Sequence, residues 1–141
     1  MSSRIALAFI VTLAIFHAVA FAVYGTWPLV TGLEPPTPES PGTFMLSVFV
    51  QKVGHSLTFV LMFYFGRAVF GQRWLLYACL WWILSVFGEF GEAIMPAYSV
   101  QEALAGVVAE AIYFPLAAFI TMRLIVPRRP PPDPAAGRET G

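Results

Sequence analysis

The stretch WLLYACLWWILSVFGEFGEAIM, from Trp74 to Met95, is almost wholly apolar until two glutamates, Glu89 and Glu92, interrupt it near its end. A bilayer core requires about 20 mostly apolar residues in each spanning helix, so this stretch is long enough to cross a membrane. A charged side chain at mid-span costs roughly 2.5–3.5 kcal/mol on insertion scales, and such groups usually have partners inside the protein. The stretch therefore predicts a membrane span that carries part of a polar site.

Three other apolar stretches have a similar length, and they give predicted spans at about residues 5–24, 43–70 and 100–126, in addition to 74–95. The chain has 141 residues, of which 58% are hydrophobic and 11% charged. About a quarter of the residues in an ordinary soluble domain are charged. We therefore expect an all-α, multi-pass membrane protein, an up-down bundle of four transmembrane helices over residues 1–126. The proline-rich remainder, residues 127–141, is predicted to be a disordered cytoplasmic tail.

The basic residues predict the orientation of this bundle. In an up-down topology every arginine falls on one side of the membrane, and the opposite loop carries Glu34 and Glu39; the arginines are Arg4, Arg67, Arg73, Arg123, Arg128, Arg129 and Arg138. The positive-inside rule then places both termini in the cytoplasm, and in a bacterium the protein would lie in the inner membrane. In an alternative interpretation residues 1–22 are a cleaved signal peptide, but His17 and the length of the apolar run argue against it.

Ionisable side chains within the spans are the candidate site, because such groups at membrane depth commonly serve in ion and proton pathways. The candidate residues are His17, Lys52, His55, Glu89, Glu92 and Glu110, with Gln51, Ser85, Glu102 and Pro115 in supporting roles. At about 1.5 Å per residue, most of these side chains fall in the outer half of the bilayer. We expect Lys52 to pair with Glu89 or Glu110.

Helical spacing places these residues on shared faces. In the third span Ser85, Glu89 and Glu92 lie on one face, and in the fourth span Glu102 and Glu110 are separated by two turns. The second span has a polar stripe formed by Ser47, Gln51, His55, Thr58 and Met62. Because membrane helices associate through small and polar side chains, these faces are predicted to meet at helix contacts. Pro115 is expected to kink the fourth span and to free a backbone carbonyl beside the site.

Four functional hypotheses follow from this pattern. The first is proton- or ion-coupled handling of a small solute by an oligomer. The second is a non-catalytic accessory subunit of a larger membrane complex, and the third is an intramembrane acid/base enzyme that acts on a lipid or isoprenoid. The fourth, a metal or haem held through His17 and His55, has weaker support, so no cofactor is predicted. Overall the pattern favours a protein that is not an enzyme.

The sequence also indicates which partners to expect and which protein family the chain resembles. Membrane lipid, a second copy or another membrane protein are the expected partners, whereas a net charge of zero without a basic patch gives no reason to expect nucleic acid. With Cys79 as its one cysteine, the chain has no internal disulfide framework. In size and number of spans it resembles small four-helix multidrug transporters. Their hallmark carboxylate lies in the first span, where this chain has His17, so none of their site residues is transferred.

Overall fold

The computed structural model describes residues 3–32, 40–95 and 98–126, and within these ranges all regular structure is helical. The helices are α1 (Ser3–Thr31), α2 (Pro41–Phe65), α3 (Arg67–Phe70), α4 (Trp74–Glu92) and α5 (Val100–Ile125). Four of them, α1, α2, α4 and α5, are long and apolar enough to cross a membrane. The prediction of an all-helical chain with four helices of membrane-crossing length is confirmed.

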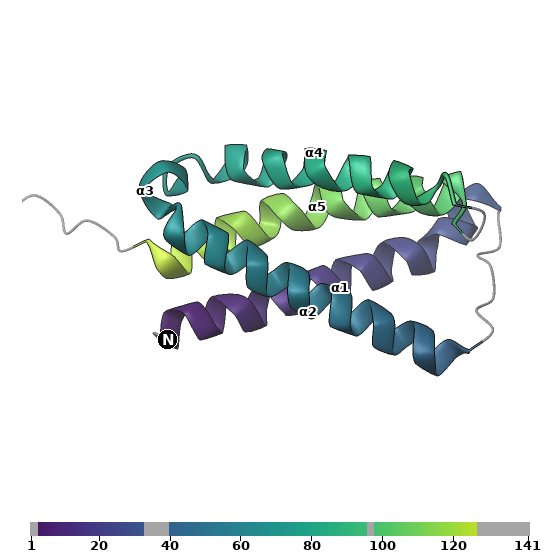
Figure 1. The fold of residues 1–141 in the computed structure, drawn as a ribbon, viewed down its shortest axis with the longest axis horizontal. Coiled ribbons are helices and arrows are strands. Elements are labelled where there is room, and N and C mark those ends of the chain that lie inside the picture. Colours follow the sequence, from purple (N-terminus) through teal and green to yellow (C-terminus); the bar gives the residue numbers. More distant parts are fainter. Residues whose placement is uncertain (1–2, 33–39, 96–97, 127–141) are drawn as a thin grey trace, which may run out of the picture.

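The four long helices alternate in direction, so that the chain reverses at each end of the molecule (Figure 1). One end, called the α3 end here, holds the start of α1, the short helix α3 and the end of α5. The other end, called the α4–α5 end, holds the connection between those two helices. The arginines in the described residues, Arg4, Arg67, Arg73 and Arg123, all fall in segments at the α3 end. This one-sided placement is what the positive-inside rule requires of a membrane protein.

Helix α5 is the centre of the bundle, since half of its most apolar window is buried, a larger share than in α1, α2 or α4. Small residues make this close packing feasible: the buried ones are Ala103, Ala105, Gly106, Ala109, Ala117 and Ala118. Two polar contacts join α5 to its neighbours α1 and α4. The Thr12 hydroxyl on α1 lies 3.2 Å from that of Thr121 on α5, and the Trp82 indole of α4 donates to the Val107 carbonyl at 3.1 Å.

Helix α2 joins the bundle mainly through its C-terminal half. Phe59 and Phe63 are fully buried there, and the Tyr77 hydroxyl of α4 donates to the Phe59 carbonyl. The N-terminal half diverges from α1 (Figure 1), and residues 41–51 are exposed apart from Val48, which is half-buried. As a result α2 has one face inside the bundle and a long face outside it.

Three predicted spans have different ends in the structure, and one of them, expected over 74–95, stops at Glu92. The span expected over 43–70 stops at Phe65, because Gly66 leaves the helical conformation (φ −85°, ψ 7°) and a separate turn, α3, follows. The first span continues past Tyr24 through Pro28 to Thr31. It ends where Gly32 adopts φ +71°, a conformation that favours glycine, and its N–H bonds the Pro28 carbonyl at 2.8 Å. The predicted disordered tail lies outside the described residues.

Candidate functional site

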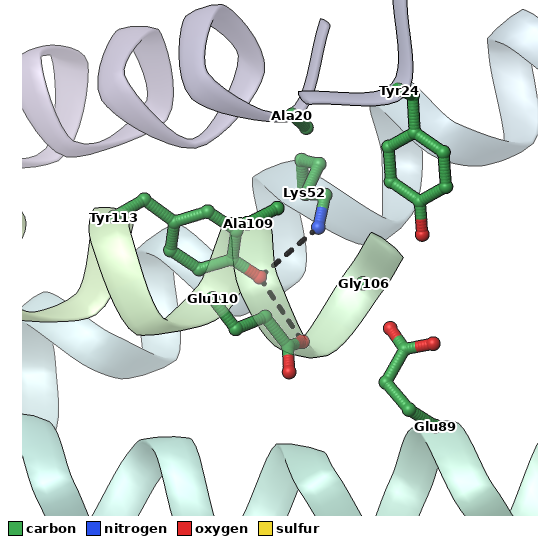
Figure 2. Close-up of a pocket in the computed structure, with 8 residues that line it drawn as sticks. All are labelled: Ala20, Tyr24, Lys52, Glu89, Gly106, Ala109, Glu110 and Tyr113. Atoms are coloured by element: carbon green, nitrogen blue, oxygen red, sulfur yellow. Dashed lines mark hydrogen bonds between the residues drawn. The ribbon is translucent and has the colours of Figure 1, made fainter. Parts of the chain in front are cut away.

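A small polar cavity is lined by residues of all four long helices (Figure 2), and Glu89 near the end of α4 places it toward the α4–α5 end. Its lining comes from α1 (Ala20, Tyr24), α2 (Lys52), α4 (Glu89) and α5 (Gly106, Ala109, Glu110, Tyr113). Measured to the centre of a water-sized sphere, its volume is about 10 Å³. That is close to the smallest space that holds one water molecule. Three charged residues predicted from sequence, one from each of three helices, therefore share one small space.

A tyrosine connects the lysine to one of the carboxylates. The Lys52 ammonium donates to the Tyr113 hydroxyl at 3.3 Å, and that hydroxyl donates to Oε1 of Glu110 at 3.2 Å (Figure 2). The Lys52 ammonium also lies 5.0 Å from the centre of the Tyr113 ring, close enough for a cation–π contact. The direct Lys52–carboxylate pair expected from sequence is thus replaced, within the described residues, by a bridge through a phenol.

Glu110 is the most deeply buried ionisable group of the cavity. It exposes only 5% of its surface, and its Oε2 atom is buried without a hydrogen-bond partner among the described residues. Ser85 of α4 lies close to the same carboxyl group, but the pair does not have the geometry of a hydrogen bond. A buried carboxylate oxygen without a partner is energetically costly, so such an atom requires an explanation, which is either a functional role or a water or ion in the adjoining cavity.

Glu89 reaches the cavity because α5 has no side chain at Gly106. A Cβ atom added at Gly106 would overlap the Glu89 carboxyl group. Glu89 comes from α4 and points across the contact between the two helices (Figure 2). The glycine therefore determines where this carboxylate sits, in addition to allowing close helix packing.

Two further tyrosines connect Glu89 to the α4–α5 end. The Tyr98 hydroxyl, in the connection between those helices, donates to Oε2 of Glu89. The Tyr24 hydroxyl of α1 lies 3.4 Å from the Tyr98 hydroxyl and 3.4 Å from the Glu102 carbonyl oxygen. Burial, and then the hydrogen bond to Glu89, raise the pKa of Tyr98, so its phenol stays neutral and remains a donor.

The remaining predicted residues have other roles or lie outside the cavity lining. Glu102 begins α5 in a capping box, in which its carboxylate accepts from the Ser99 N–H at 2.8 Å and its own N–H donates to the Ser99 hydroxyl. Glu92 is exposed at the end of α4, and Gln51 is exposed on α2. Pro115 is half-buried within α5.

Neither histidine lines the cavity. His17 Nδ1 lies 2.9 Å from the Leu13 carbonyl oxygen and its ring is 5.7 Å from that of Phe49, while Nε2 is buried without a partner in the described part of the chain. His55 is half-buried on α2. Residues 3–32, 40–95 and 98–126 contain no group of three or more His, Cys, Asp or Glu side chains arranged to hold a metal ion. The metal and haem hypothesis stays untested.

The sequence interpretation missed the tyrosines of the site. Tyr98 donates to Glu89, Tyr113 bridges Lys52 and Glu110, and the Tyr24 hydroxyl lies beside that of Tyr98. One of them had a usable signal, because Tyr113 follows Glu110 by three residues and so lies on the same helix face. No local signal identifies Tyr24 or Tyr98, whose contact joins residues far apart in the chain.

Comparison with known proteins adds no functional assignment. No family model matches the chain, and no curated protein or solved structure matches it. The geometry of the cavity is therefore the basis for a functional proposal.

We predict that Gly106→Ala lowers the free energy of unfolding by about 1–3 kcal/mol relative to Gly88→Ala, because the new methyl group displaces the Glu89 carboxyl and breaks the hydrogen bond that it accepts from Tyr98. Gly88→Ala is the matched control, since a Cβ there meets open space. Reversible unfolding in mixed micelles measures both. Adding Glu89→Ala should relieve the overlap, so that Gly106→Ala costs little in that background. Equal effects of the two glycine substitutions would contradict the assigned contact.

We predict that Tyr113→Phe also destabilises the protein, by roughly 1–3 kcal/mol, because Lys52 and Glu110 both lose their hydrogen-bond partner in a buried place. Tyr64→Phe is the control, because the Tyr64 hydroxyl makes no hydrogen bond within the described residues. The same unfolding assay compares the two variants. A Tyr113→Phe protein as stable as Tyr64→Phe would show that the bridge is not formed.

Proposed function

We propose that this chain is an integral membrane protein, with both termini in the cytoplasm, whose polar cavity binds a proton or a small cation. Binding there would couple the movement of that ion to the handling of a small solute. The observation that carries the proposal is the Glu110 carboxylate, buried at the meeting point of four helices with one oxygen free to accept a partner.

Membrane location is supported by the surface of the helices. Large apolar side chains are exposed along all four long helices, among them Ile10, Phe21, Val50, Leu80, Leu84, Phe87, Ile112 and Leu116. Soluble monomers rarely expose contiguous apolar areas on this scale. In lipid the same side chains are in a favourable environment, and the arginines at the α3 end would face the cytoplasm.

The size and chemistry of the cavity favour a proton or a small cation over an organic ligand. Space for about one water excludes a lipid or isoprenoid chain from the cavity as it stands. Two carboxylates and one ammonium group meet there, so their formal charges sum to −1, which favours the uptake of one positive charge. Neither the accessory-subunit hypothesis nor the lipid-enzyme hypothesis accounts for a buried cavity with a net charge of −1.

Two hydrogen-bonded groups give the ion a defined route. At the outer end, Tyr98 donates to Glu89, and deeper in the bundle Tyr113 connects Glu110 to Lys52. A proton that reaches Glu89 has Glu110 across the same cavity as its next acceptor. A carboxylate pair of this kind resembles the relays that transporters use. The solute itself would pass outside this narrow bundle, between protomers.

Topology is tested by cysteine labelling in a Cys79→Ala background, because the native thiol is exposed. Ser40 precedes α2 at one end of the molecule, and Gln72 precedes α4 at the other. We expect Ser40→Cys to react with an impermeant maleimide applied to intact cells, and Gln72→Cys to react only after permeabilisation. Labelling of both from outside would contradict the orientation, and the Cys79→Ala protein alone gives the background.

The ion-binding proposal is tested with the full chain in liposomes that carry an imposed potential and contain, in separate preparations, dyes sensitive to pH, Na⁺ or K⁺. We expect Glu110→Gln to reduce proton flux by about a hundredfold, the usual scale for losing a positioned proton-transfer group. Glu92→Gln, an exposed carboxylate on α4, should retain most of the flux. Wild-type vesicles without flux of protons, Na⁺ or K⁺ would refute the proposal, and so would a fully active Glu110→Gln.

A further inference from the structure

Helix α2 carries a polar strip on the side that faces away from the bundle. Its members are Ser47, Gln51, Gly54 and Thr58, called the α2 strip here, and all four are exposed. Their spacing of four, three and four residues keeps them on one face of a helix. At about 100° per residue, the buried Ser56 and Phe63 lie on the opposite side. The polar stripe expected at helix contacts within this chain therefore points outward.

Gln51 makes this face unusual for a helix in lipid. It lies two residues from the middle of α2 (Pro41–Phe65), which corresponds to about 3 Å along the axis. Its amide makes no hydrogen bond within the described residues, although it carries both donors and an acceptor. Polar side chains at this depth normally bond across a helix contact rather than face hydrocarbon. The α2 strip therefore requires a partner from outside this bundle.

We propose that the partner is a second copy of this chain, with the two α2 helices packed parallel through their α2 strips. The strip is self-complementary: a two-fold axis along the membrane normal brings Gln51 opposite Gln51, and each amide can donate to the other. It is also uncharged, so that two copies bring no like charges together. Lys52 lies on the inner side of α2, where it donates to Tyr113.

The centre of the strip has the shape that close helix pairing needs. Gly54 is exposed, and a Cβ added there meets nothing within 4 Å of its own chain. A glycine flanked by Gln51 and Thr58 at spacings of three and four lets two backbones approach while hydroxyl and amide groups bond across the contact. Spacing that alternates between four and three residues is typical of left-handed helix pairs. The inference rests on the proposed membrane location, but not on ion binding.

Self-association is measured by energy transfer between labelled copies of the full chain in phosphatidylcholine vesicles at graded protein-to-lipid ratios. We expect Gln51→Leu to raise the dissociation constant on the order of 10- to 300-fold, because both copies lose the amide and with it two interhelical hydrogen bonds. Gly54→Leu should weaken association further, without loss of folded protein. Gly88→Leu is the matched control, since Gly88 on α4 is likewise exposed with open space around it. A wild-type monomer, or a Gly88→Leu effect equal to that of Gly54→Leu, would overturn the proposal.

Cysteine crosslinking locates the contact, again in the Cys79→Ala background. Cysteines at Gln51 and Gly54 should crosslink between copies, whereas those at Leu46 and Leu57, exposed on the same helix but off the strip, should not. Equal crosslinking at all four positions, or crosslinking only at the control positions, would refute the α2 strip.

Extraction of the same vesicles with alkaline carbonate separates the proposed membrane location from the proposed pairing of α2 helices. Protein released by alkali would refute membrane location, whereas retained but monomeric protein would refute the strip alone.

Discussion

The structure depends on placing the Glu110 carboxylate inside a four-helix contact. Glu110 lies on α5, whose small buried residues bring α1 and α4 close enough to enclose it. Enclosure removes water from the carboxylate, so the protein must supply its hydrogen bonds. Tyr113 supplies one of them and in turn accepts from Lys52, which fixes α2 against the same helix. The charged group therefore specifies the arrangement of the helices that bury it.

The second carboxylate, that of Glu89, is positioned by different contacts. Glu89 occupies the space left by Gly106 and accepts from Tyr98 in the connection between α4 and α5. The site thus has two carboxylates. Glu110 is the more deeply buried and is bridged to the Lys52 ammonium, whereas Glu89 is linked through Tyr98 to the end of the bundle. One small space lies between them, lined by residues of α1, α2, α4 and α5 (Figure 2). This combination is the basis of the proposal that the cavity binds and transfers one positive charge.

The sequence predicted the helices well because their signal is long and apolar, and it predicted Lys52, Glu89 and Glu110 because charged residues are rare in such segments. The positions of the helix ends were predicted less accurately. Gly66 ends α2 earlier than composition indicated, and Pro28 is accommodated within α1. A residue pair distant in sequence, such as Tyr24 and Tyr98, leaves no periodic pattern.

The orientation of α2 could not be predicted for a related reason. Its sequence has polar residues on both sides, Lys52 on one and Gln51 on the other. Periodicity shows which residues share a face, but packing against α1 and α5 decides which face is inward. The structure turns Lys52 to the cavity and leaves Gln51 outside, and this arrangement separates the cavity from the proposed contact between copies.

Infrared difference spectroscopy of the full chain in lipid, recorded between acidic and alkaline pH, tests the central claim that Glu110 takes up and releases a proton within the bundle. We expect wild type to show a carbonyl band of a protonated carboxylic acid that grows on acidification, and we expect Glu110→Gln to lack that band. Glu92→Gln should keep it. Identical spectra for wild type and Glu110→Gln would show that Glu110 does not exchange a proton, and would contradict the role proposed for the cavity.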